Sequence, residues 1–82
     1  MSRIDESKPF IPVGIAVLTV SDTRTLADDR SGDTLVDRIA SAGHRLVGRD
    51  IVPDDREAIR ARVQSWIADP AVDVVITTGG TG

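Results

Sequence analysis

The sequence predicts an α/β fold, a fragment of a parallel three-layer sandwich in which strands and helices alternate as β-α-β-α-β. Two apolar, β-branched runs, at residues 13–20 and from Val72 onward, are continuous rather than alternating, which is typical of parallel strands buried on both faces. Between them lie two segments whose apolar residues recur at helical spacing. The connections are short enough for right-handed crossovers. A chain of 82 residues allows one small domain of this kind.

The chain begins with a predicted arm, residues 1–12, which contains two prolines and mixed charges without periodicity. The first strand, residues 13–20, is apolar throughout, so we expect it at the centre of the sheet. Ser21 and Asp22 follow at its carboxyl end.

The first helix is predicted over residues 32–42, with Ser31 as its N-cap and Gly43 as its left-handed terminating residue. Asp28 and Asp29, beside Arg30, are interpreted as part of a solvated loop. The apolar side chains expected to face the sheet are Leu35, Val36, Ile39 and Ala40.

A second strand is predicted over residues 44–52, and its half-polar composition indicates an edge position. Asp54 with Glu57 resembles a capping box that opens a second helix over residues 55–68. The inner face of this helix is predicted to carry Ile59, Val63, Trp66 and Ile67.

With the most apolar strand in the middle, the predicted spatial order of the strands is 2-1-3, and the two helices cover opposite faces. Strands one and three then diverge at a topological switch point, where open α/β sheets bind their ligands. The segments expected to line this crevice are Ser21–Asp22 and Thr77 to Gly82.

The composition also excludes several kinds of partner and site. The net charge is −3 and the charges are interspersed, so there is no basic stripe for nucleic acid. No run is long enough to span a membrane, and the absence of cysteine excludes disulfides and thiolate metal sites. We therefore expect a cytoplasmic protein with neither nucleic-acid nor membrane partners.

Three groups of residues could carry chemistry. The loop of Thr78, Gly79, Gly80, Thr81 and Gly82 offers unobstructed backbone N–H groups for a phosphate, although a flexible turn is the alternative. Ser21 and Asp22 either contact a ligand or close a local turn. Asp54 is either a helix cap, a catalytic or magnesium-binding carboxylate, or both. His44 is interpreted as a surface residue and Trp66 as a core residue.

Four motifs, in this order, resemble the MoaB/MogA family of molybdenum cofactor biosynthesis and are most similar to MoaB. They are LTVSDTR at 18–24, DRSG at 29–32, IVPDD at 51–55 and ITTGGTG at 76–82. The resemblance covers residues 13–82 and implies the N-terminal half of a molybdopterin-binding-domain-like fold. It implies molybdopterin as substrate and adenylylation of molybdopterin by ATP (or GTP) with Mg²⁺, without a covalently bound cofactor. Family members assemble as trimers or hexamers.

By this resemblance, Asp54 matches the family's functional aspartate and is assigned a catalytic and metal-binding role. Ser21, Asp22 and the loop from Thr78 to Gly82 match the pterin and nucleotide site. Because the family's second functional aspartate lies beyond the matched half, the resemblance leaves three alternatives open. They are a molybdopterin adenylyltransferase-like enzyme, a non-catalytic pterin- or nucleotide-binding member, and a truncated inactive fragment that folds only by association.

Overall fold

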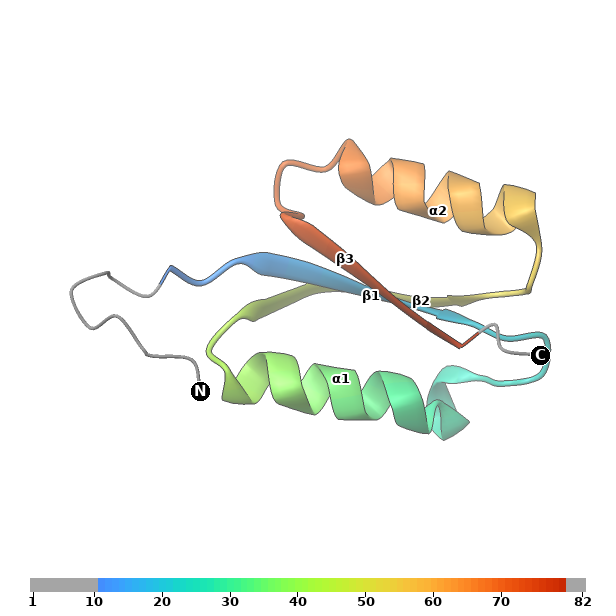
Figure 1. The fold of residues 1–82 in the computed structure, drawn as a ribbon, viewed down its shortest axis with the longest axis horizontal. Coiled ribbons are helices and arrows are strands. Elements are labelled where there is room, and N and C mark those ends of the chain that lie inside the picture. Colours follow the sequence, from blue (N-terminus) through green and yellow to red (C-terminus); the bar gives the residue numbers. More distant parts are fainter. Residues whose placement is uncertain (1–10, 80–82) are drawn as a thin grey trace, which may run out of the picture.

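The computed structural model describes residues 11–79, and every structural statement below concerns these residues. Three parallel strands, in the order β2-β1-β3, form one sheet, with α1 on one face and α2 on the other (Figure 1). The predicted β-α-β-α-β order and the 2-1-3 arrangement are therefore confirmed. The elements are β1 (Gly14–Val20), the 3₁₀ turn η1 (Leu26–Asp28), α1 (Arg30–Ser41), β2 (Arg45–Val52), α2 (Arg56–Ile67) and β3 (Val74–Gly79).

β1 is buried along its whole length, and its alternating side chains belong to two separate cores. Ala16, Leu18 and Val20 pack with Val52 and Trp66 on the α2 side. Ile15 and Val17 pack with Ile39 on the α1 side, where Val13, Leu35 and Ile76 complete the cluster. The first strand is therefore central, as its unbroken apolar run predicts.

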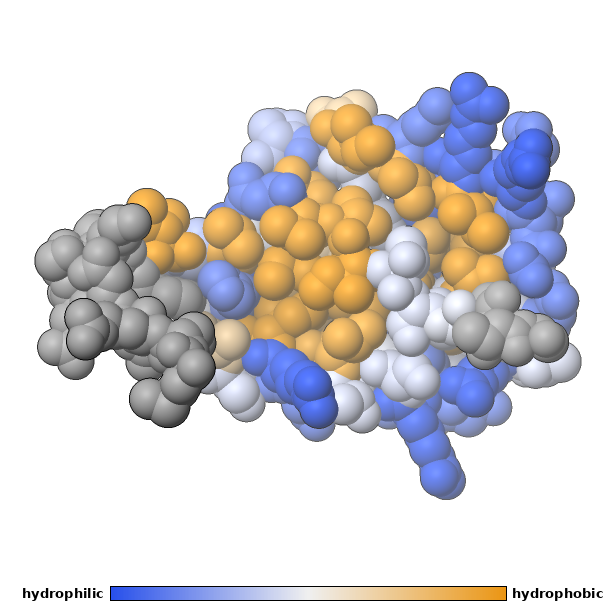
Figure 2. Space-filling model, viewed as in Figure 1, coloured by the Kyte–Doolittle hydropathy of each residue, from blue (hydrophilic) through white to orange (hydrophobic). Residues whose placement is uncertain are grey.

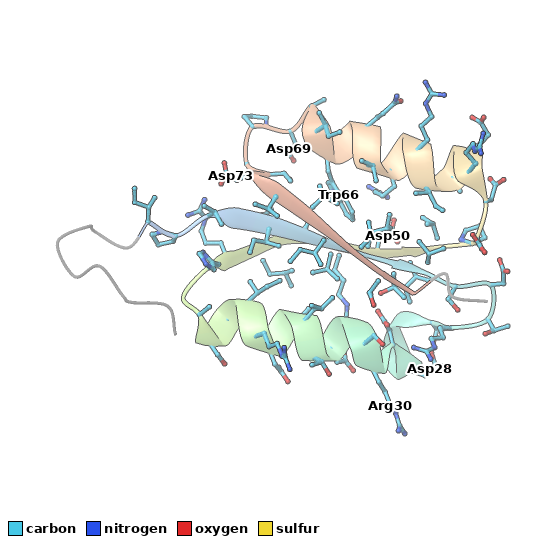
Figure 3. All side chains as sticks on the ribbon, in the orientation of Figure 1. Asp28, Arg30, Asp50, Trp66, Asp69 and Asp73 are labelled. Carbon is cyan, nitrogen blue, oxygen red and sulfur yellow. The ribbon has the colours of Figure 1, made fainter. Side chains whose placement is uncertain are left out.

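Trp66 is a core residue, as predicted, and it anchors α2 to the sheet. Its side chain points from α2 toward β2, where Gly48 leaves room for the indole (Figure 3): a Cβ at Gly48 would lie 2.8 Å from Trp66 Nε1. The Arg62 guanidinium lies 5.3 Å from the centroid of this ring and also pairs with Asp50 at 2.7 Å. The glycine in the half-polar second strand thus provides space for the largest side chain of the core.

Some predicted burial is wrong at the ends of the helices. Ile67 is 72% exposed because it is the last residue of α2 and turns away from the sheet. Ala40 is also exposed, one position past Ile39 on the α1 surface. In both helices the buried stripe is therefore narrower than the spacing of apolar residues suggests.

The third strand is only partly buried, although its sequence pattern predicts full burial: Val75 packs against the α2-side core and Ile76 against the α1-side core. Within the described residues β3 pairs only with β1, so its other side is an open edge and Val74 is 41% exposed. Figure 2 shows an apolar surface over the beginning of β3 and between β3 and α2. A continuous apolar run thus indicates which side chains a strand can bury. How far they are buried depends on the elements that pack around the strand.

The most unexpected feature is the carboxylate of Asp29, which is completely buried beneath the first turn of α1. Its Oδ2 accepts a hydrogen bond from the Thr19 hydroxyl at 2.6 Å, and its Oδ1 accepts one from the Gly32 N–H at 3.1 Å. Arg49 on β2 lies 3.3 Å from the same carboxylate and 2.7 Å from Asp33. One side chain therefore ties β1, α1 and β2 together.

Two sequence predictions are wrong at this point. Asp29, not Ser31, is the N-cap of α1, and the helix begins at Arg30. Asp29 is also not part of a solvated loop, although its neighbours Asp28 and Arg30 are exposed and lie on the outer side of the helix start (Figure 3). A cap that also faces a buried threonine and an arginine depends on long-range contacts, so local sequence could not identify it.

The neighbours of Asp29 lower the pKa of its carboxyl group. Burial by itself raises that pKa, but hydrogen bonds from Thr19, from the Gly32 N–H and from Arg49, together with the Arg49 charge, outweigh it and hold the pKa below its usual 3.8. Since the folded pKa is depressed, the stability contributed by this carboxylate is fully present above about pH 4. It is lost as the pH falls through the folded pKa.

We expect Asp29→Ala to lower the free energy of unfolding by about 3 kcal/mol, because it leaves Arg49 without its buried partner. Asp29→Asn keeps the shape but loses the charge, so a smaller loss is expected. Urea unfolding at neutral pH measures both, with Asp28→Asn as the exposed control. The difference between wild type and Asp29→Asn should shrink below about pH 4. An Asp29→Asn protein as stable as Asp28→Asn at neutral pH would contradict this role.

Candidate functional site

A crevice of about 560 Å³ opens at the carboxyl ends of the strands, as the switch-point argument predicts. It brings together five of the predicted site residues, namely Ser21, Asp22, Asp54, Thr78 and Gly79. Gly80, Thr81 and Gly82 lie outside the described residues. The other residues that line the crevice are Thr19, Val20, Thr23, Arg24 and Ser31.

One wall of the crevice is built by the register of β1 against β3. Thr19 is paired with Thr78, and Val20 with Gly79, at the ends of the two strands. Gly79 has a φ of +85°, and a Cβ there would collide with the carbonyl oxygen of Val20. Glycine is therefore required at this position, because the backbone takes a left-handed conformation while touching the neighbouring strand.

Ser21 and Asp22 make different contacts in the loop after β1. The Ser21 hydroxyl oxygen accepts hydrogen bonds from the N–H groups of Thr23, at 3.3 Å, and Arg24, at 3.1 Å, so it closes the local turn. Asp22 does not close this turn. Its Oδ1 instead accepts the backbone N–H of Asp54 at 2.9 Å, across the crevice loops.

Asp54 is not the cap of the second helix, so the predicted capping box with Glu57 is wrong. Asp55 is the N-cap, and its carboxylate accepts the Ala58 N–H at 3.0 Å. The turn before α2 is tight, because the Asp55 N–H also donates a hydrogen bond to the Pro53 carbonyl at 2.7 Å. Asp54 is thereby exposed at the crevice, and the ion pairs within the described residues do not use its carboxylate.

Five crevice residues, among them Thr19, Ser31 and Arg24, were not predicted as site residues. Thr19 is the buried link to Asp29, Ser31 lies in the first turn of α1, and Arg24 is the one basic residue among the described lining. Thr19 could have been found, because it is the polar exception in the apolar run. Arg24 and Ser31 lie in the motifs LTVSDTR and DRSG, which mark the two segments without singling out either residue.

The donor set allows a metal shared with a ligand rather than a site built by protein alone. Across residues 11–79 no group of three or more His, Cys, Asp or Glu side chains is arranged to hold an ion. The exposed carboxylate of Asp54 suits Mg²⁺, which usually takes one or two protein carboxylates plus phosphate oxygens and water. Asp22 adds a second carboxylate to the crevice, with its Oδ1 bonded to the Asp54 N–H. The residues present therefore fit a magnesium ion that arrives with a phosphorylated ligand.

His44 lies away from the crevice. His44 is half-buried rather than on the surface, and its Nδ1 accepts the Val13 N–H at 3.1 Å, at the opposite end of β1 from the crevice.

In the part of the chain between residues 11 and 79, no helix has the length and apolar character needed to cross a membrane.

These features define a class: a parallel α/β domain with a polar, glycine-walled crevice at its switch point. The match to a protein family is more specific, since residues 16–82 fit the profile described as "Probable molybdopterin binding domain". The chain belongs to this family.

Named relatives agree with the family assignment. The chain is 53% identical over 82 residues to "Molybdenum cofactor biosynthesis protein B" of Escherichia coli K12, covering 100% of this chain and 47% of the relative. The protein of the same name from Bacillus cereus is 44% identical over 81 residues, or 96% of this chain and 48% of the relative. The chain thus spans about half the length of the relatives that it matches.

A solved structure supports the fold. "Crystal structure of Molybdenum cofactor biosynthesis protein B" superposes with a TM-score of 0.86 at 40% identity, over 92% of this chain and 47% of that one. The arrangement of three parallel strands and two helices is therefore that of the corresponding half of a known protein.

The assignment of the α2 cap to Asp55 leads to a stability prediction. Asp55→Ala should cost about 1 kcal/mol of unfolding free energy, because it removes the N-cap acceptor. Asp54→Ala should change stability by less than about 0.5 kcal/mol, since its carboxylate is exposed and caps nothing. Urea unfolding of the two variants side by side makes the comparison. Equal destabilisation by the two substitutions would contradict the assignment.

Proposed function

We propose that this chain contributes to molybdenum cofactor biosynthesis by binding molybdopterin and a nucleotide in the crevice at its switch point. The observation that carries the proposal is the convergence there of Asp54, the Ser21–Asp22 loop and the Thr78–Gly79 wall. The family match and the names of the relatives support the same pathway.

The proposed reaction is adenylylation of molybdopterin by ATP with Mg²⁺. A phosphate oxygen of the pterin attacks the α-phosphorus of ATP, the bond from that phosphorus to the bridging oxygen breaks, and pyrophosphate leaves. Mg²⁺, when bound with the nucleotide, neutralises the phosphate charge. Such a transfer depends mainly on positioning and electrostatics, which fits a crevice with few reactive side chains.

Each wall has a proposed task in this reaction. Asp54 would hold the magnesium through its exposed carboxylate, and backbone N–H groups of the loop from Thr78 to Gly82 would contact the phosphates. Ser21 and Asp22 form the opposite wall. Because the chain covers less than half of the relatives' length, the rest of the active site is proposed to be supplied by the part of the domain outside the matched region.

Further properties remain proposals on the same basis. They are the use of ATP or GTP as the nucleotide, assembly into trimers or hexamers, and a cytoplasmic location. A second candidate function is binding of the pterin or nucleotide without chemistry.

Titration calorimetry with ATP, Mg²⁺ and molybdopterin tests the proposal, and a pyrophosphate assay separates the two candidates. We expect binding by the wild type and a roughly tenfold weaker magnesium-dependent affinity in Asp54→Ala, about the value of one charge-assisted contact. Asp69→Ala is the control, because Asp69 lies between α2 and β3, at the far end of the sheet (Figure 3). Absence of any binding would overturn the proposal, and binding without pyrophosphate release would favour the non-catalytic alternative.

A further inference from the structure

The two loops that carry the crevice carboxylates leave the sheet side by side. β1 and β2 are paired in register up to Val20 and Val52, and the Ser21 N–H continues the ladder to the Val52 carbonyl at 2.9 Å. Asp22 and Asp54 therefore start from neighbouring backbone positions, although they are 32 residues apart in the sequence.

Beyond that backbone bond, a single side-chain hydrogen bond joins the two loops within the described residues. Asp22 Oδ1 accepts the Asp54 N–H at 2.9 Å. On the far side of Asp54, the turn is held by the Asp55 N–H bonded to the Pro53 carbonyl and by the Asp55 side chain on α2. The bond from Asp22 thus ties the backbone of this turn to the loop that follows β1.

This contact gives Asp22 a task that does not require touching the ligand. The direction of the Asp54 carboxylate depends on the orientation of its own backbone, which Asp22 restrains from the neighbouring loop. Asp22 is also a poor direct partner for a phosphate, since two negative charges repel each other. A backbone N–H needs only an acceptor oxygen, whether from a carboxylate or from an amide.

We propose that Asp22 is a positioning residue: it sets the orientation of Asp54 toward the ligand-bound metal through the Asp54 N–H, and its charge is not required. This proposal rests on the proposed function and refines the part played there by Asp22. It separates the two crevice aspartates, because Asp54 acts through its charge and Asp22 through an oxygen acceptor.

The experiment compares Asp22→Asn with Asp22→Ala in titrations with Mg²⁺ and ATP. Asparagine retains an acceptor oxygen, so Asp22→Asn should retain most of the affinity. Asp22→Ala should weaken the affinity by roughly three- to tenfold, the value of one such hydrogen bond. Asp69→Ala, which removes an exposed aspartate acceptor of the Ala71 N–H, is the matched control and should bind as the wild type does.

A double-mutant cycle with Asp54→Ala makes the test specific. If Asp22 acts through Asp54, Asp22→Ala should cause little further loss once the Asp54 carboxylate is gone. An undiminished loss in that background would show that Asp22 acts on the ligand directly and would overturn the proposal. Equal weakening by Asp22→Asn and Asp22→Ala would also overturn it, because the charge would then be essential.

A ligand-free measurement distinguishes failure of this inference from failure of the proposed function. Amide hydrogen exchange, read residue by residue by NMR, should show a protected Asp54 N–H in wild type and in Asp22→Asn, and faster exchange in Asp22→Ala. If the wild type binds no nucleotide, the proposed function fails while this result still tests the contact. Unchanged exchange in Asp22→Ala would refute the contact itself.

Discussion

The complete burial of β1 is the constraint on which the rest of the structure depends. A strand with no exposed side must have a strand on each edge and a helix on each face, and here β2, β3, α1 and α2 fill those four places. The alternation of its side chains then divides the interior into an Ala16–Leu18–Val20 core and an Ile15–Val17 core. Because its neighbours are parallel, their carboxyl ends meet at one edge, and the crevice follows from that geometry.

Asp29 connects this apolar framework to the crevice. Thr19, the polar residue on the α1 side of β1, would be a buried hydroxyl without a partner if Asp29 did not accept its hydrogen bond. The same carboxylate begins α1, which places Ser31 at the crevice, and reaches Arg49 on β2. This buried charge is tolerated because three donors, from Thr19, Gly32 and Arg49, bond to the carboxylate. The carboxylate thereby sets the position of a helix relative to two strands.

β3 is an edge strand of the sheet within the described residues. Its outer edge is unpaired within the described residues, Val74 is exposed there, and Figure 2 shows an apolar surface over the beginning of the strand. Unpaired parallel edges with apolar flanks favour association with further strands. A relative twice as long as the matched region has additional chain with which to cover such a surface.

Much of this protein can be deduced from sequence alone, because its strongest signals are local. The unbroken apolar run of residues 13–20, the helical spacing around Ile39 and Trp66, and the glycines after β3 identify the elements, their order and the edge that holds the crevice. The caps, the burial of Asp29 and the hydrogen bond from the Asp54 N–H to Asp22 emerged only from the fold. Each of these depends on a contact between residues far apart in the chain or on a choice between adjacent aspartates, and identical carboxylates carry no local mark of the partner that they will meet.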